Sequence, residues 1–147
     1  MKISTKGRYG MRAMLDLAVN YAQSPILLKD VARRQDISLK YLDRICSSLK
    51  AAGLLKSSRG SKGGFTLSRP PDEITLKEIV EVLEGPLVLV GCTSDKHYCK
   101  RVNACVTRDI WYELSRSMES VLGLKTLEDL TKRERKKRKA SGPMYYI

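Results

Sequence analysis

Apolar residues recur with helical spacing three times in the first third of the chain. The first stretch, residues 8–22, has one apolar face, which is made of Met11, Met14, Leu15, Ala18 and Val19. A shorter helix is expected over residues 29–36. A third is expected over 39–52, where the Ser38 hydroxyl can cap the first turn and Gly53 can end the helix in a left-handed conformation. We expect Leu39 and Leu42 of this helix to face the core.

Two short runs, residues 54–57 and 65–68, flank a loop rich in Gly, Ser, Lys and Arg. This pattern predicts a β-hairpin with a basic tip. Three helices followed by a hairpin are typical of a winged helix-turn-helix. Pro70 and Pro71 mark its end. Residues 1–70 are therefore predicted to be a DNA-binding region.

The second half of the chain predicts more helices. Thr75 and Glu78 form a capping box for a helix that ends at Gly85. A polar loop leads to a longer helix that runs to about Leu122. Its apolar stripe consists of Ile110, Trp111, Leu114, Met118, Val121 and Leu122. We expect this stripe to form a dimer interface; the alternative is that it packs on its own domain. Thr126 starts a last short helix, and residues 131–147 are expected to be a basic, disordered tail.

The predicted fold class is mainly α with a small β-hairpin wing. It is a winged helix-turn-helix plus a long C-terminal dimerisation helix, with residues 71–130 holding the linker helix, the cysteine loop and the dimerisation helix.

The net charge of +12 is distributed unevenly along the chain. Residues 1–70 hold fourteen Lys and Arg against four acidic residues, residues 71–130 hold seven against eleven, and residues 131–147 hold seven against one. A strongly basic first half suggests a polyanionic partner, most often nucleic acid, although surface lysine can also serve solubility alone. The basic tail either adds phosphate attraction or is simply solvated.

In this fold the start of the third helix enters the major groove and the hairpin tip meets the minor groove or the phosphates. Arg and Lys can donate to guanine, and Asp can accept from cytosine. The candidates on the third helix are Ser38, Lys40, Tyr41, Asp43 and Arg44. Those on the hairpin tip are Arg59, Gly60 and Lys62, and those suited to phosphate contacts near the N-terminus are Lys6 and Arg8.

Several classes of protein fit the sequence poorly. The N-terminus lacks a signal-peptide pattern and no apolar run approaches a membrane span, so we expect a cytoplasmic protein without a membrane partner. One histidine and no nucleophile–base arrangement argue against an enzyme. An RNA-binding module is disfavoured because no aromatic base-stacking surface is evident.

Cys92, Cys99 and Cys105 cluster in the polar loop, while Cys46 lies far away in the third helix. Soft thiolates bind iron–sulfur clusters or zinc, and His97 in the same loop could add a ligand. Three thiols without any ligand are the remaining interpretation. Cys46 lies on an apolar face and is interpreted as a packed core thiol.

Four segments resemble one family of bacterial winged-helix regulators, typified by IscR, NsrR and CymR. They are MKISTKGRYGMRAMLDLA at the start, ISLKYLDRI in the third helix, GLLKSSRGSKGGFTLSRP in the hairpin and ITLKEIVEVLEGP after it. The resemblance covers about residues 1–130. It implies a homodimer that binds palindromic promoter DNA and is joined through the long helix after the cysteine loop.

The loop cysteines are similar to those of the cluster-binding branch. The resemblance implies an iron–sulfur cluster on Cys92, Cys99 and Cys105, with 2Fe–2S favoured over 4Fe–4S. The fourth ligand is open, because Arg108 stands where IscR-like members have His, and Arg8 where NsrR-like members have Asp. His97, Asp95 and Asp109 are the candidates.

The predicted function is a homodimeric DNA-binding transcriptional regulator, either a repressor or an activator, that senses iron–sulfur or redox status through the cysteine loop. The alternative is a cluster-free regulator of cysteine or sulfur metabolism that is controlled by a partner protein or by thiol oxidation.

Overall fold

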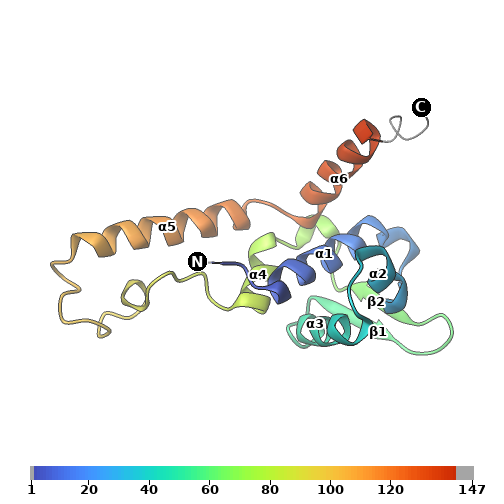
Figure 1. Ribbon diagram of the computed structural model, residues 1–147, viewed down its shortest axis with the longest axis horizontal. Coiled ribbons are helices and arrows are strands. Elements are labelled where there is room, and N and C mark those ends of the chain that lie inside the picture. Colours follow the sequence, from blue (N-terminus) through green and yellow to red (C-terminus); the bar gives the residue numbers. More distant parts are fainter. Residues whose placement is uncertain (1, 142–147) are drawn as a thin grey trace.

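Six α-helices and one β-hairpin make up residues 2–141, the part of the chain that the computed structural model describes (Figure 1). The helices are α1 Thr5–Val19, α2 Leu28–Gln35, α3 Leu39–Ala51, α4 Leu76–Glu84, α5 Val106–Gly123 and α6 Leu127–Ser141. The strands are β1 Leu55–Ser58 and β2 Gly64–Leu67, and short 3-10 turns lie at Tyr21–Gln23, Pro71–Glu73 and Gly91–Thr93. The predicted fold class, mainly α with a hairpin wing, is confirmed.

Helix α1 begins three residues earlier than the apolar pattern predicts. The Ser4 hydroxyl caps it by accepting a hydrogen bond from the Gly7 N–H at 3.0 Å. The Glu84 carboxylate, at the end of α4, accepts from the Ser4 N–H at 3.0 Å. Gly7 leaves room for this carboxylate, since a Cβ there would overlap it. A contact across 80 residues therefore sets the start of α1, which local sequence could not indicate.

The caps of α3 and α4 are as predicted. The Ser38 hydroxyl accepts from the Tyr41 N–H at 3.2 Å, and Gly53 after the helix has a φ of 81°. Thr75 and Glu78 form the reciprocal capping box. Capping satisfies amide groups that a helix end otherwise leaves without partners.

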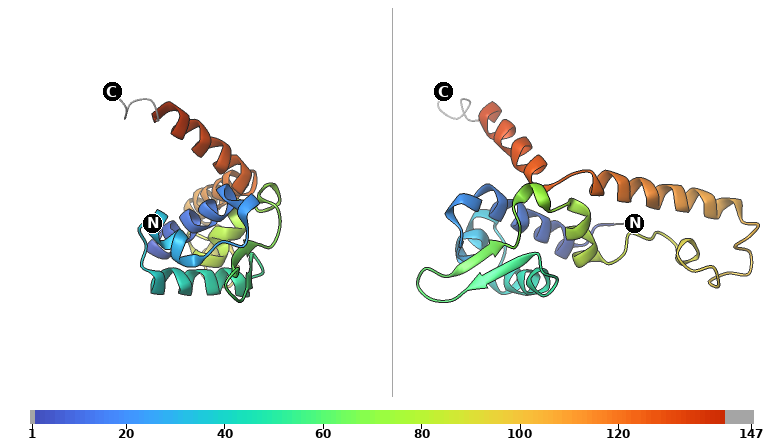
Figure 2. Two further views of the ribbon diagram at one scale, coloured as in Figure 1. Left: turned by 90° about the vertical axis from the view of Figure 1, so that its right-hand side faces the viewer. Right: turned by 180° about the vertical axis from the view of Figure 1, so that it is seen from behind.

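The core surrounds α1. This helix packs against α2, α3, α4 and α6, and it lies between α3 on one side and α6 on the other (Figures 1 and 2). The largest fully buried side chains include Met14, Leu42, Ile45, Ile79 and Leu127. Burying such a side chain contributes about 1.5–3 kcal/mol. Since Ile79 and Leu127 share this core with α1 and α3, the core crosses the boundary expected at residue 70.

The hairpin is attached to the helices at its base. Leu55 pairs with Leu67, and both are buried in the core. Ile26, before α2, forms an isolated β-bridge with Phe65 on the open side of β2. The tip, between the two strands, therefore projects from a base that is fixed on both sides.

Helix α5 and the loop before it extend away from the helical body (Figure 2). The loop returns to α5 through a weak hydrogen bond from the Leu89 N–H to the Ser115 hydroxyl at 3.4 Å. None of the helices in the described range 2–141 is long and apolar enough to cross a membrane.

The expectation of a disordered tail from residue 131 is wrong as far as Ser141, because α6 continues to that residue. Thr126 and Asp129 cap its start, and Leu127 and Thr131 are fully buried. Once a first turn is fixed, extending a helix costs little, and Lys, Arg and Glu are good helix formers. Residues 142–147 of the expected tail lie outside the described residues.

Candidate DNA-binding surface and cysteine loop

The outer face of α3 carries charged side chains. Lys40, Asp43 and Arg44 are exposed, while Leu42 and Ile45 on the opposite face are fully buried. Ser38 is exposed at the start of the helix, with its hydroxyl engaged in the cap. This half of α3 therefore presents two cations and one carboxylate to solvent.

The prediction that Leu39 faces the core is wrong. This side chain is 50% exposed, and it lies with Lys40 and Asp43 beside the start of α2 and Phe65 of the hairpin. Because Leu39 is the first residue of α3, its side chain precedes the turn that packs on the core. Sequence reasoning missed it as a surface residue, since helical spacing alone gives Leu39 and Leu42 similar directions.

Tyr41 lies at the edge of this surface. It is half-buried, and its ring packs edge-on against Tyr9 of α1, with 5.9 Å between the ring centroids. The Arg12 guanidinium lies over the Tyr9 ring at 5.3 Å from its centroid. This stack holds the first half of α1 beside the start of α3. Of the other candidates on α1, Arg8 is exposed and Lys6 is half-buried.

The hairpin tip brings Arg59, Gly60 and Lys62 together, and all three are exposed. Gly60 has a φ of 98° and Gly64 a φ of 148°, which are conformations that favour glycine. A Cβ on Gly64 would overlap the backbone of Ile26, so the hairpin can approach the segment before α2 this closely only with glycine there.

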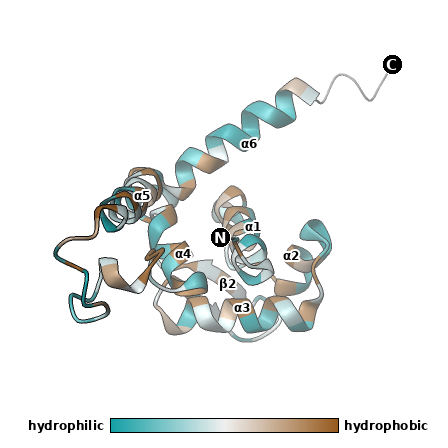
Figure 3. Cartoon of the chain, turned by 60° about the vertical axis from the view of Figure 1, so that its left-hand side comes forward, coloured by the Kyte–Doolittle hydropathy of each residue, from teal (hydrophilic) through white to brown (hydrophobic). Residues whose placement is uncertain are grey.

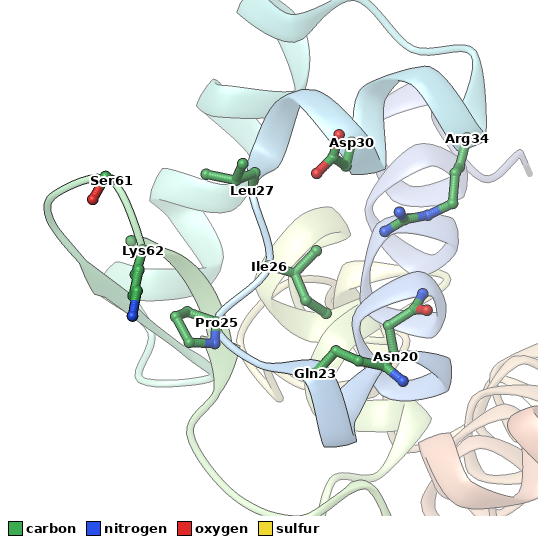
Figure 4. Close-up of a pocket in the computed structure, with 10 residues that line it drawn as sticks. Asn20, Gln23, Pro25, Ile26, Leu27, Asp30, Arg34, Ser61 and Lys62 are labelled. Carbon is green, nitrogen blue, oxygen red and sulfur yellow. The ribbon is translucent and has the colours of Figure 1, made fainter.

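A polar pocket separates the hairpin tip from α2 (Figure 4). Ser61 and Lys62 line it from the tip, and Asp30 and Arg34 line it from α2. The Nε and Nη2 atoms of Arg34 donate to Asp16 of α1.

Asp16 of α1 is buried and holds the end of α2. Its carboxylate accepts from Arg34 Nε at 3.0 Å, from Arg34 Nη2 at 2.6 Å and from Gln35 Nε2 at 2.9 Å. The hydrogen bond to Asp16 raises the pKa of Arg34 above its usual value. Arg12 also donates to the Gln35 carbonyl. The helix α2 is thus fixed to α1 just before the turn that leads into α3.

The three loop cysteines lie in different surroundings. Cys92 is half-exposed in the 3-10 turn, Cys99 is exposed, and Cys105 is the residue directly before the first turn of α5. The Cys105 sulfur lies 3.2 Å from the Thr107 hydroxyl, and this hydrogen bond, together with the first amides of α5, lowers the pKa of the thiol. His97 is exposed, and its backbone N–H donates to Asp95 at 2.8 Å.

Arg108 joins the two ends of the loop. Its Nε donates to the Cys92 carbonyl at 2.8 Å, so the first cysteine is tied to the first turn of α5. Within residues 2–141, no three His, Cys, Asp or Glu side chains lie close enough together to hold a metal ion. The described arrangement therefore does not bring Cys92, Cys99, Cys105 and His97 together.

Cys46 on α3 differs from the loop cysteines. It is fully buried, and desolvation raises the pKa of its thiol to about 12. Such a thiol is inert at neutral pH. This environment agrees with the interpretation of Cys46 as a core residue.

Large apolar side chains remain exposed on α5. They are Val106, Ile110, Trp111, Tyr112, Leu114 and Val121. Figure 3 shows hydrophobic and hydrophilic positions interspersed along the α5 ribbon. A second apolar area lies where α1 meets α4 and the end of α5, lined by Ile3, Met11, Val80 and Leu122. Exposed apolar area of this extent on a small protein marks a contact surface.

A charged, capped helix in a helix-turn-helix arrangement, beside a basic hairpin, defines a winged helix-turn-helix DNA-binding protein. Residues 3–133 match the family described as "Rrf2: Iron-dependent Transcriptional regulator". The chain belongs to this family and is a DNA-binding transcriptional regulator. Its relatives are named as regulators, which agrees with the expectation that it is not an enzyme.

Relatives of two kinds are similar to the chain. The regulator CymR of Bacillus subtilis is 42% identical over 130 residues, which cover 88% of this chain and 89% of CymR. The regulator IscR of Xenorhabdus nematophila is 36% identical over 134 residues, 91% of this chain and 81% of IscR. The solved structure of T. potens IscR has a TM-score of 0.79 and 40% identity, covering 99% of this chain and 97% of that one.

Proposed function

We propose that the protein is a homodimeric regulator that reads palindromic promoter DNA and binds an iron–sulfur cluster through Cys92, Cys99 and Cys105. The observation that carries this proposal is the position of the three-thiol loop. It leaves α4, which packs on α1 and α3, and it leads directly into α5. A group bound there lies between the DNA-reading core and the proposed dimer helix.

The charged face of α3 supports DNA reading. In this proposal the exposed Lys40 and Arg44 donate to guanine, and the exposed Asp43 accepts from cytosine. Exposed Leu39 suits contact with a thymine methyl group. Ser38 and Tyr41 flank these side chains. Phosphate contacts are assigned to residues near the hairpin tip and at the start of α1, namely Arg59, Gly60, Lys62, Lys6 and Arg8.

The exposed apolar side chains of α5 support a homodimer. A second copy related by a two-fold axis would cover them with the same side chains of its own α5. The same two-fold axis would relate the two α3 helices of the dimer, so that each could read one of two half-sites about 34–36 Å apart on the duplex.

The chemistry of the three loop thiols supports an iron–sulfur cluster, although the cysteines must first come closer together. Three thiols lie on a solvent-accessible loop, and the Cys105 thiol has a lowered pKa, which favours the thiolate that a metal needs. A bound cluster supplies a charge that changes with its oxidation state and joins the three cysteines covalently. Arg108 already holds Cys92 next to α5, and the fourth ligand is proposed to be His97 or a loop carboxylate.

Binding at this loop would act on DNA affinity through geometry. Gathering Cys92, Cys99 and Cys105 requires the loop to tighten, because the described arrangement keeps them apart. The loop joins α4 to α5, so tightening it moves the dimer helix relative to the core. The two α3 helices of a dimer would then change their spacing against fixed half-sites.

A cluster-free regulator is the second candidate, favoured by the 42% identity to CymR. In this case the exposed loop thiols would respond to oxidation or to a partner protein. The lowered pKa of Cys105 suits thiol oxidation, since the thiolate is the reactive form.

The deciding experiment is anaerobic purification followed by a visible absorption spectrum and assays of iron and sulfide. We expect a coloured protein, with the band shape distinguishing 2Fe–2S from 4Fe–4S. The colour should be lost in Cys92→Ala, Cys99→Ala and Cys105→Ala. Cys46→Ala is the control, because this buried thiol should not affect the colour.

DNA binding is then compared for the loaded and cluster-free protein on its own promoter region by fluorescence anisotropy. A difference in affinity that disappears in Cys105→Ala supports sensing through the loop. Protein that stays colourless after anaerobic reconstitution contradicts the cluster and supports the second candidate.

A further inference from the structure

A second basic surface lies on the side of the molecule opposite to α3. In Figures 1 and 2, α6 rises above the helical body while α3 and the hairpin lie below it, with α1 between them. The exposed part of α6 is thus directed away from the face that carries Lys40 and Arg44.

Residues 132–139 of α6 are strongly cationic. Seven of the eight are Lys or Arg, and Glu134 is the single acidic one. Glu134 pairs with Arg138 at 2.7 Å, and no other ion pair in the described chain involves this segment. The remaining cations lie four residues apart in like-charged pairs, such as Lys132 with Lys136, and repel each other on the helix surface. A polyanion would relieve this repulsion.

The direction of this segment is fixed by the first turns of α6. The Leu127 N–H donates to the Ile74 carbonyl at 3.0 Å, and the Leu127 side chain is fully buried. Thr131 is also buried, while the side chains from Arg135 onward are exposed. The cations therefore project on a helix whose base belongs to the core.

We propose that residues 132–139 of α6 form a second, sequence-independent site for duplex DNA, so that one molecule holds two duplex segments on opposite faces. This segment extends about 12 Å at about 1.5 Å per residue. A duplex carries one negative charge per about 1.7 Å, or about seven over the same length. The cation density of α6 matches the phosphate density of a duplex.

Other anionic partners fit this segment less well. An amphipathic helix that binds membranes needs an apolar face, and residues 132–139 contain no apolar side chain. An acidic protein surface would call for cations on one face, whereas these cations surround the helix. A duplex groove with phosphates on both sides suits a helix that is cationic all round.

The proposal is independent of the cluster, but holding two duplexes rests on the proposed reading face of α3. The test captures a fluorescent duplex on beads that carry a second, biotinylated duplex, with the full-length protein as the only bridge. The variant neutralises Lys136→Gln, Lys137→Gln and Lys139→Gln together. Gln keeps a helix propensity close to that of Lys, and circular dichroism checks that helicity is retained.

All proteins in this test are prepared without a cluster, so that the loop's proposed sensing role does not enter the comparison. The matched control removes three charges from the cysteine loop, at the other end of the molecule, by Lys96→Gln, Lys100→Gln and Arg101→Gln. We expect the wild type and the control to bridge the two duplexes. The α6 variant should capture about tenfold less of the fluorescent duplex. The slope of the capture against the logarithm of salt should fall by about 2–3 in the α6 variant if each Lys neutralises one phosphate.

Binding of a single duplex is measured separately by anisotropy, so that failure of the α6 site can be told apart from failure of the reading face on α3. A wild-type protein that binds one duplex but captures no second one overturns the α6 site and leaves the reading face standing. Equal capture by the α6 variant and the control also overturns it, as does binding of anionic vesicles without bridging of DNA. Loss of promoter-specific binding in Lys40→Gln and Arg44→Gln, measured with α6 intact and in excess unlabelled duplex of unrelated sequence, separately tests the reading face.

Discussion

Substitution of Asp16 is expected to loosen the helix-turn-helix, and the structure gives the size of the effect. The carboxylate is 3% exposed and accepts four hydrogen bonds, two from Arg34, one from Gln35 and a weak one from Asn20 at 3.4 Å. Asp16→Asn keeps one acceptor but loses the bidentate ion pair. The Arg34 side chain is 36% exposed, so water can solvate it once the ion pair is gone. We therefore expect the free energy of unfolding to fall by about 2 kcal/mol, less than for a fully buried pair.

Substitution of Arg34, the partner of Asp16, should lower the free energy of unfolding by more. Arg34→Gln leaves a buried carboxylate without its cation, and such a change costs about 3–5 kcal/mol in a fully buried pair. Since Gln35 still donates to Asp16, we expect about 3 kcal/mol. In a protein of this size each kcal/mol lowers Tm by about 2–4 °C. The double variant should recover about 1–2 kcal/mol relative to the sum of the two losses.

Urea unfolding followed by far-UV circular dichroism measures these losses. Arg33→Gln is the control, because Arg33 is 76% exposed and pairs with Asp30 only at 3.5 Å, so its loss should stay below about 0.5 kcal/mol. The pKa of Arg34 is raised in the folded state, so its contribution is complete below its unfolded pKa and is lost only as pH rises through the higher folded value. Additive losses in the double variant would refute the coupling of α1 to α2 through this pair.

Three further changes test other parts of the fold and the loop. Gly64→Ala should destabilise the protein by more than about 1 kcal/mol in thermal melts and weaken DNA binding, because the new Cβ would overlap the backbone of Ile26. Gly53→Ala is the comparison: it has a positive φ but open space around it, so it should destabilise by only about 1 kcal/mol. Ser38→Ala should cost about 1 kcal/mol through the lost cap of α3, seen as a lower urea midpoint with unchanged slope. Alkylation of Cys105 in cluster-free protein, followed by mass spectrometry over a range of pH, should begin at a lower pH than alkylation of an ordinary thiol. Thr107→Val should raise the pH at which alkylation is half complete. An unchanged half-complete pH in this variant would contradict the hydrogen bond from Thr107.

The elements of the fold could be predicted wherever local signals decide them. The Ser38 cap, the Thr75–Glu78 capping box and the glycine after α3 all act within a few residues, and the structure has them where the sequence places them. The early start of α1 could not be predicted, because it depends on Glu84 from another helix.

The length of α6 could not be predicted for a related reason. A run of Lys and Arg is ambiguous by composition, since it suits both a solvated tail and a helix. Burial of Leu127 and Thr131 against the core stabilises the helix, and this burial is a tertiary contact that local sequence does not show. The Thr126 and Asp129 pair, a capping pattern followed by good helix formers, is the local signal for this helix.

The candidate site was predictable as a set of residues but not as a geometry. Charged positions on α3 and the hairpin tip follow from helical period and turn composition, and they are exposed as expected, with Tyr41 packed against Tyr9. The role of Arg108 in holding Cys92 depends on how the loop returns to α5, which spacing does not specify.

The burial of Leu127 beside α1 has a consequence for how the chain folds. During synthesis α1 cannot bury its full apolar face until the base of α6 has emerged, so the core is completed only after both helices are made. A fragment that stops near residue 70 would leave the faces of α1 and α3 that pack on Ile79 open to water. Contacts between such distant residues also slow folding, since a long loop must close before they form. We therefore expect α1 and the first turn of α6 to exchange their amide hydrogens as one cooperative unit.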